Sequence, residues 1–179
     1  MANVKATDIV IIRDMLKDRE NDLRTLTSQL TPDALKVFQT TLSLNWIPLA
    51  IEAEILQAAA GLFFPSDARP LFKLGHMVAG KQFTGIYKLF LRIPSVSFIV
   101  KNVSSTYNTL MDSGKARIDD LTSNGATFAI SGLSELTSIQ REYISGVITC
   151  ILELAGAKNL NVVKVENNPQ EWKWKISWK

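Results

Sequence analysis

Glu171-Trp172-Lys173-Trp174-Lys175-Ile176-Ser177-Trp178, close to the end of the chain, carries three of its four tryptophans at every second position. Successive side chains of a β-strand point to opposite faces, so strict alternation of this kind predicts a strand. One face would hold the three tryptophans and Ile176, and the other would hold the two lysines and Ser177. The stretch therefore predicts a two-faced strand whose large apolar face covers part of a core.

The segments before this strand predict its partners. Ala116–Leu121 and Ala126–Ser131 flank a turn that ends in Asn124-Gly125, and Asn-Gly is a strong hairpin signal. Leu160–Val165 would form a second hairpin with the tryptophan strand, around a turn at residues 167–170.

A helix is predicted between the two hairpins. Thr137-Ser138-Ile139-Gln140 fits the capping-box pattern, and Gly156 follows the last turn. The apolar face of the helix would consist of Ile139, Tyr143, Val147, Cys150, Ile151 and Leu154. The order of hairpin, helix and hairpin predicts an α+β protein, with a four-stranded antiparallel sheet and this helix across one face.

The first part of the chain reads mainly as helices. Asp8–Arg13 is β-branched and predicts a short strand before a polar helix from about Asp14 to Leu30. Thr31 and Pro32 suit the start of a second helix, and a third is expected from about Trp46-Ile47-Pro48 to a stop at Gly61.

The middle of the chain also predicts helices. Pro70–Phe90 contains glycines at positions 75, 80 and 85, which predicts one or two closely packed helices. A further helix is expected from about Ser95 to Met111, ending at Gly114. We expect residues 1–179 to form a single domain, with a helical part over about 1–114 and a sheet part over about 115–179.

Composition narrows the class of protein. The net charge is +3 and the pI about 9.0, but no run of five like charges is present, so nucleic acid is not an expected partner. The single cysteine excludes an internal disulfide and fits a cytoplasmic protein. The sequence lacks the pattern of a signal peptide and a stretch apolar enough to span a membrane.

Few residues suggest chemistry. Gly75–Lys81 follows the spacing of a phosphate-binding loop, but Gln82 replaces the Ser or Thr that contacts magnesium, so glycines that permit close helix packing are the preferred interpretation. His76, the only histidine, is expected to be a hydrogen-bonded structural residue, with a proton shuttle or axial ligand as the alternative. Cys150 is expected to be buried and inert. We therefore predict no catalytic residue and no metal site.

A resemblance extends these expectations. Lys5-Ala6-Thr7, the segment from Leu74-Gly75-His76 to Phe83, Tyr143–Ala157, Val163-Lys164-Val165 and Ile176-Ser177-Trp178 resemble an uncharacterised bacterial family of about the same length, abundant in myxobacteria. That family is similar to the haem-nitric-oxide-binding sensor domains, the vinyl-4-reductase domains and the Bet3-like subunits of the TRAPP trafficking complex. The resemblance implies one shared ligand-binding α+β fold.

The haem motifs of those sensors do not recur. The resemblance places the iron-binding histidine on the helix from Ser95 to Met111, which contains none, and the Tyr-x-Ser-x-Arg motif near Ala129–Leu133, which keeps only Ser131. We therefore expect no haem and no other cofactor.

The first functional hypothesis is a non-enzymatic sensor or regulatory domain that binds a small apolar or aromatic ligand between helices and sheet. The residues expected to line the pocket are Phe83, Tyr87, Phe98, Tyr107, Phe128, Tyr143, Trp172 and Trp174. The alternative is an interaction or homodimerisation module, in which Gly75, Gly80 and Gly85 mark close helix contacts and a partner covers Phe63 and Phe64.

Overall fold

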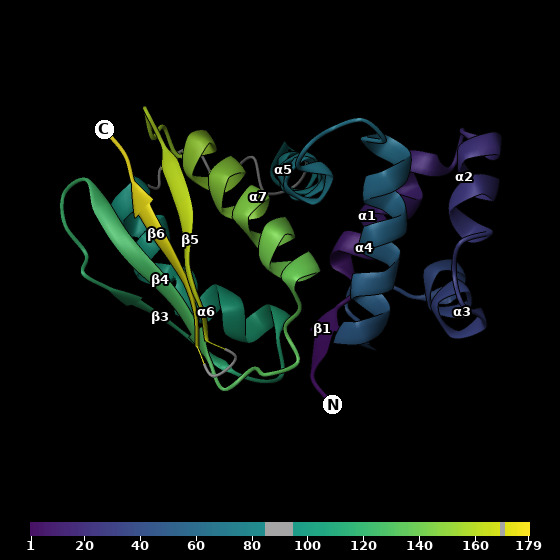
Figure 1. Cartoon of the computed structure of the whole chain (residues 1–179), viewed down its shortest axis with the longest axis horizontal. Helices are drawn as coiled ribbons and strands as arrows, with labels where there is room; N and C mark the ends of the chain where they lie inside the picture. Colours follow the sequence, from purple (N-terminus) through teal and green to yellow (C-terminus); the bar gives the residue numbers. More distant parts are fainter. Residues whose placement is uncertain (85–94, 169–170) are drawn as a thin grey trace.

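The computed structural model of the chain describes residues 1–84, 95–168 and 171–179 (Figure 1). The described elements begin with β1 (Asn3–Lys5), α1 (Thr7–Leu16), α2 (Glu20–Thr27), α3 (Pro32–Thr40), β2 (Trp46–Pro48) and α4 (Leu49–Phe63). They continue with α5 (Pro70–Thr84), α6 (Val96–Leu110), β3 (Lys115–Asp119), β4 (Gly125–Ser131), α7 (Ser138–Leu154), β5 (Asn161–Asn168) and β6 (Glu171–Ser177).

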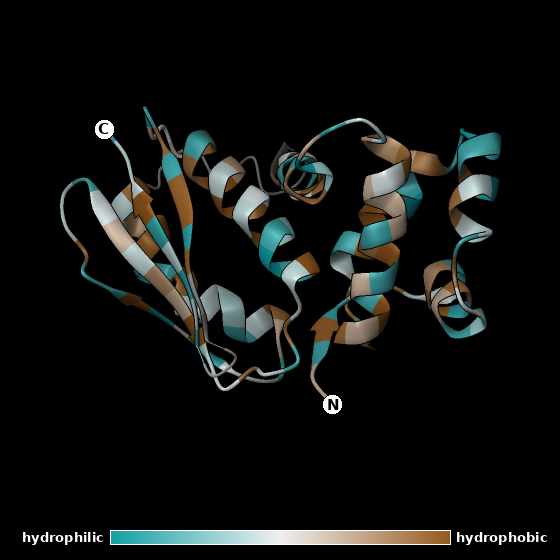
Figure 2. Ribbon diagram, in the orientation of Figure 1, coloured by the Kyte–Doolittle hydropathy of each residue, from teal (hydrophilic) through white to brown (hydrophobic). Residues whose placement is uncertain are grey.

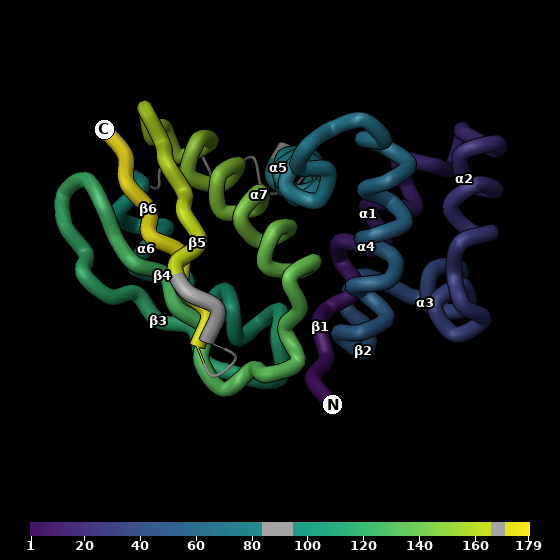
Figure 3. Tube along the Cα trace, in the orientation of Figure 1, coloured from purple at the N-terminus to yellow at the C-terminus, as the bar shows by residue number. Residues whose placement is uncertain are grey.

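The beginning of the chain differs from the sequence prediction. Asp8–Arg13 is not a strand but part of α1, because Ile9, Ile12 and Leu16 share one helical face and are buried together. Trp46–Pro48 is not the start of a helix but strand β2, which pairs antiparallel with β1. Figure 3 shows these two short strands side by side next to the start of α4.

Helix boundaries were predicted better where a capping residue is present. Thr31 caps α3 by accepting a hydrogen bond from the Ala34 N–H, and Ser95 caps α6 in the same way from Phe98. Gly61, expected to end its helix, lies inside α4, which continues to Phe63. The polar helix expected over Asp14–Leu30 is interrupted between α1 and α2.

The sheet consists of the four antiparallel strands that the sequence predicts. Its order is β3-β4-β6-β5, and all neighbouring strands are antiparallel. The two predicted hairpins and the capping box of α7 are confirmed, with Thr137 and Gln140 bonding each other's backbone N–H. The turn residues 169–170 lie outside the described part. The tryptophan strand, β6, is central, because β4 and β5 pair on either side of it.

Helix α7 lies between the sheet and α5 (Figure 1). On one side, the Trp174 indole N–H donates to the Ser145 hydroxyl over 2.9 Å, and the ring stacks on Phe128 with centroids 5.3 Å apart. On the other side, α7 crosses α5 closely at two glycines. A Cβ on Gly75 would lie 2.1 Å from the Tyr143 carbonyl oxygen, and one on Gly146 would lie 2.0 Å from that of Phe72. The predicted role of the glycines in close helix packing is confirmed for Gly75.

One hydrophobic cluster joins the helical part to the sheet. It includes Ile55 and Leu56 of α4 as well as Ile130 and Trp174 of the sheet. Brown apolar segments occur accordingly in both parts of the chain in Figure 2. Over the described residues, we found no helix with both the length and the hydropathy required to cross a membrane.

Candidate functional site

A cavity of about 200 Å³ lies where the sheet, α6, α7 and the start of the chain meet. Its walls are almost entirely apolar. They are formed by Val4, Asp8, Leu49, Glu52, Val103, Thr106, Tyr107, Leu110, Met111, Phe128, Ile130, Leu133, Leu136, Gln140, Tyr143, Ile144, Val147, Ile148 and Ile151. Thr106 and Leu110 are exposed residues of α6, so the cavity reaches the surface beside that helix.

One face of α7 forms a long wall of the cavity. Residues 140, 143, 144, 147, 148 and 151 all line it, and their spacing of three and four residues is that of a single helical stripe. From the sheet, Phe128 and Ile130 of β4 line the opposite side, two residues apart and therefore on one face. The cavity is thus a gap left between α7 and the sheet that it covers.

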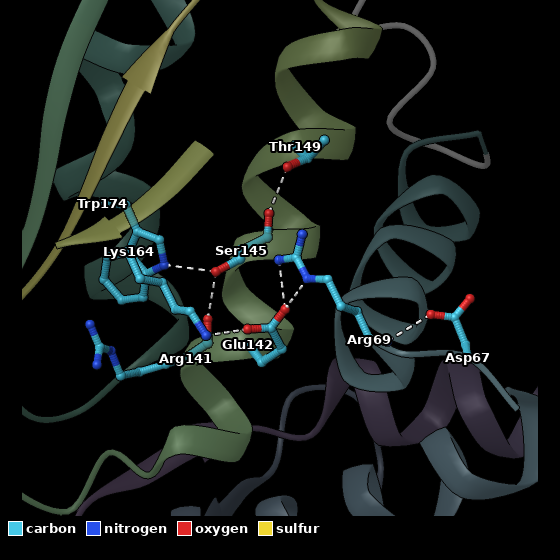
Figure 4. Close-up of polar contacts among 8 residues, drawn as sticks. All are labelled: Asp67, Arg69, Arg141, Glu142, Ser145, Thr149, Lys164 and Trp174. Atoms are coloured by element: carbon cyan, nitrogen blue, oxygen red, sulfur yellow. Dashed lines mark hydrogen bonds and ion pairs between the residues drawn. The ribbon is translucent and has the colours of Figure 1, made fainter. Parts of the chain in front are cut away.

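Ion pairs outside the cavity fix α7 in place. Glu142 accepts hydrogen bonds from the Arg69 Nε, over 2.7 Å, and from the Lys164 ammonium, so that it joins the start of α5 to β5 (Figure 4). Burial raises the pKa of Glu142, but the two cations outweigh it and the net shift is downward. Glu142 therefore stays ionised and holds three elements together.

The polar end of the cavity contains two carboxyl groups. The Tyr143 hydroxyl donates to Oδ2 of Asp8 over 2.8 Å, and Nε2 of Gln140 donates to Oε2 of Glu52 over 3.2 Å. The same Gln140 nitrogen also donates to the Leu49 carbonyl over 2.8 Å. Both carboxyl groups face the cavity from helices of the N-terminal part, Asp8 from α1 and Glu52 from α4.

Burial controls the ionisation of this end. Loss of hydration, and after it the neighbouring charge of Asp8, raise the pKa of Glu52 to about 8 against the opposing hydrogen bond from Gln140. Burial also raises the pKa of Asp8, although the Tyr143 hydrogen bond opposes it. The pKa of Tyr143 lies well above its usual value because of burial and the Asp8 charge. The two carboxyl groups therefore compete for ionisation.

The structure brings together three of the residues predicted to line a pocket. Tyr107, Phe128 and Tyr143 all line the cavity. The Tyr107 hydroxyl is already used, because it donates to the Ser113 carbonyl over 2.8 Å. Next to it, Gly114 has a φ of +78°, and a Cβ there would lie 2.7 Å from that hydroxyl.

The other predicted pocket residues lie elsewhere. Trp174 is fully buried between the sheet and α7, stacked on Phe128, and Trp172 packs beneath the guanidinium of Arg141, 4.0 Å from the ring centroid. Phe98 is 57% exposed on α6. Phe83 is half-buried at the end of α5, outside the lining, and Tyr87 lies outside the described residues.

The two remaining candidates from the sequence, His76 and Cys150, lie outside the cavity lining. Nε2 of His76 lies 2.7 Å from a carboxylate oxygen of Glu153, on a partly exposed surface. Cys150 is buried, and burial raises the pKa of its thiol to about 11. In the described ranges, no group of three or more His, Cys, Asp or Glu side chains is arranged to hold a metal ion.

Two features of the interaction hypothesis are also corrected. Gly75 is covered by α7 of the same chain, and a Cβ on Gly80 would lie 3.6 Å from the Cys150 sulfur, so their close neighbour is internal. Gly85 lies outside the described residues. Phe63 and Phe64 are half-buried against the core and contact each other, rather than standing exposed.

Sequence reasoning missed Asp8, Glu52 and Gln140. A weak local signal was present for the two acids, since Asp8 begins an otherwise apolar run to Ile12 and Glu52 stands between Ile51 and Ala53, but both lie in the first turn of a helix, where acids are common. An isolated acid on the buried stripe of a helix is unusual, because an unpaired charge is costly to bury. Only the burial of both acids in the folded chain distinguishes them from ordinary acids of a first turn.

Comparison with known proteins gives a family and a fold. The profile of a family described as "Protein of unknown function (DUF2378)" matches residues 73–179. No curated protein matches the chain in sequence.

Solved structures of H-NOX proteins, the haem-nitric-oxide-binding domains of the resemblance, share the fold. An Fe(II) unliganded H-NOX protein from K. algicida superposes with a TM-score of 0.65 at 13% identity, covering 98% of this chain and 96% of its own. An oxygen-binding H-NOX domain related to soluble guanylate cyclases gives a TM-score of 0.65 at 13% identity, covering 97% and 92%. The α+β fold predicted from the sequence is therefore the H-NOX fold.

The described part of the cavity lining does not supply a usual haem site. Haem iron binds His, Cys or Tyr, or Met opposite a His. The one histidine, His76, lies outside the lining, and the high pKa values of Tyr107 and Tyr143 oppose the tyrosinate form that binds iron. Asp8 and Glu52 would also repel the propionates of haem. Within the described lining, the chemistry of the cavity therefore differs from that of a haem pocket.

Proposed function

The chain belongs to the DUF2378 family of proteins of unknown function, and on that premise we propose that it is a non-enzymatic sensor or regulatory domain that binds a small apolar or aromatic ligand in its cavity. The observation that carries this proposal is the cavity itself, whose apolar walls end in a small polar group of side chains. Small-molecule sites commonly combine such walls with a few polar groups that orient the ligand.

The volume of the cavity supports a small ligand. An apolar cavity of about 150 Å³ in another protein holds benzene or xenon. The cavity here, at about 200 Å³, has room for one ring with a short substituent. Native cores are packed with few voids larger than a water molecule, so a space of this size is not a usual feature of packing.

A binding role suits the lining better than catalysis. Among the described lining residues there is no His, Cys, Ser or Lys, and the two tyrosine hydroxyls already donate to Asp8 and to the Ser113 carbonyl. Nucleophilic catalysis needs an activated nucleophile beside a base. The side chains present are instead suited to holding a ligand in one orientation.

The test is ligand binding with and without the cavity. Ethylbenzene, as an apolar probe, should raise the melting temperature of the native chain, because binding to the folded state alone stabilises it. Val147→Phe, which adds atoms inside the cavity, should abolish that rise. Val163→Phe makes the same change on the exposed side of β5 and should leave the rise intact.

An equal response of native protein and Val147→Phe would place the binding outside the cavity, and no response of the native protein to saturating ethylbenzene would contradict the proposal. Circular dichroism of Val147→Phe would establish that the variant is folded, so that a lost response reports the filled cavity. Native mass spectrometry of protein purified without refolding would identify a ligand that is carried along.

A further inference from the structure

The charged end of the cavity narrows the class of ligand, and this inference rests on the proposed function. We propose that the ligand is a small amine, whose apolar group fills the cavity and whose ammonium group binds between the carboxyl groups of Asp8 and Glu52.

The first observation is that both acids are open to the cavity on one side. Glu52 is only 6% exposed and lines the cavity, and Gln140 occupies just one of its oxygens. One carboxylate oxygen of Asp8 accepts the hydrogen bond from Tyr143. Protein surrounds the Asp8 carboxyl group, but part of the residue's surface is accessible because the residue lines the cavity. Within the described part of the chain, the second oxygen of each acid accepts no hydrogen bond.

The second observation is the lack of a compensating cation. No Lys, Arg or His belongs to the described lining, although two carboxyl groups do. A buried carboxylate without a cationic partner is strongly unfavourable. Because of burial and the adjacent Asp8, the pKa of Glu52 rises to about 8, so at neutral pH the group holds its proton until a cation binds beside it. The groups that face it, Asp8, Gln140 and Tyr143, provide no positive charge.

An ammonium group meets both requirements. It carries one positive charge and three N–H donors, enough to serve the second oxygen of each acid at once. Hydrogen bonds between charged partners are stronger than neutral ones, and low polarity around them strengthens the attraction. A carboxylate ligand would instead bring a third acid into the same space. The walls around Phe128, Ile130 and Val147 match an aromatic or branched apolar group on the amine.

Three probes that share a phenylethyl group test the proposal by calorimetry at pH 7. They are 2-phenylethylamine, the neutral ethylbenzene and the anion 3-phenylpropionate. The amine should bind about tenfold tighter than ethylbenzene or better, as expected for a charge-assisted hydrogen bond, and the anion should bind weakest. Amine binding should also release a proton from Glu52, seen as a dependence of the heat on the ionisation enthalpy of the buffer.

Variants assign the effect to the two acids. Glu52→Gln and Asp8→Asn keep the size of the side chain and should each remove most of the advantage of the amine, while ethylbenzene affinity changes little. Asp14→Asn, an exposed acid of α1, should change neither affinity. Retained ethylbenzene binding in a variant shows that it is folded and that its cavity is intact.

The outcomes separate this inference from the function on which it rests. If ethylbenzene binds as tightly as the amine, or if 3-phenylpropionate binds best, the amine is ruled out while the apolar cavity remains a binding site. If none of the three probes binds, the proposed function itself fails. An amine advantage that survives in both Glu52→Gln and Asp8→Asn would also overturn the inference.

Discussion

Gly75→Ala should separate α5 from α7 and destabilise the protein. The new Cβ would lie 2.1 Å from the carbonyl oxygen of Tyr143, 3.0 Å from its carbonyl carbon and 3.3 Å from its Cα. All three atoms belong to the backbone of α7, so no rotation of a side chain can relieve the clash. The helices must move apart by about 1 Å, since a Cβ atom essentially never lies closer than 3.0 Å to another heavy atom.

The cost can be estimated from two opposing effects. Overpacking a well-packed interior costs typically about 1–3 kcal/mol and occasionally more, and a clash with rigid backbone falls at the upper end. Alanine gains about 1 kcal/mol over glycine in a helix interior, which offsets part of this cost. We expect a net loss of about 2 kcal/mol or more in the free energy of unfolding.

Urea unfolding followed by circular dichroism measures that change. Gly61→Ala provides the matched control, because it makes the same substitution in α4, where no atom beyond the adjacent residues and the backbone of the same helix lies within 4 Å of the new Cβ. It should stabilise the protein by up to about 1 kcal/mol. If Gly75→Ala were as stable as Gly61→Ala, the close crossing of α5 and α7 would be wrong, and with it the position of the α7 wall of the cavity.

Three further outcomes are expected. Thr137→Ala removes half of the capping box with Gln140 and should lower the unfolding free energy by about 1 kcal/mol in urea titration. Trp174→Phe removes the buried hydrogen bond to Ser145 as well as ring volume, so it should lower the melting temperature more than Ser145→Ala does; thermal unfolding of both variants measures the difference. The pKa of Glu52 is raised on folding, from 4.5 to about 8, so folding favours its protonated form. The contribution of Glu52 to the free energy of unfolding is therefore complete below pH 4.5 and decreases as the pH rises towards 8. Glu52→Gln should make the free energy of unfolding less dependent on pH over this range, as measured by urea titrations.

The sheet half of the fold was predictable because its signals are local. Alternation in Trp172–Trp178, the Asn124-Gly125 turn and the capping box at Thr137 each specify an element within a few residues. The errors lie where tertiary packing decides. Asp8–Arg13 is β-branched, but its place in the core selects a helix, and packing of this kind routinely overrides weak local preference. Strand β2 forms only because β1, far away in sequence, pairs with it.

The candidate site was predictable only in part. Aromatic residues near the junction of helices and sheet pointed to Tyr107, Phe128 and Tyr143, which do line the cavity. Phe128 and Trp174 occupy paired positions on the same face of neighbouring strands, so the sequence could not show that only Phe128 lines the cavity. Asp8 and Glu52 are far apart in the chain, and only folding of α1 against α4 places both at the cavity.

Crystals of the protein under xenon pressure test the central claim most directly. Xenon enters apolar cavities of this size, and its strong scattering locates it without a known ligand. We predict one xenon site between Phe128, Tyr143 and Val147, absent in Val147→Phe. Crystals whose xenon lies only at the surface, with side chains closed over the space between α7 and the sheet, would contradict the account.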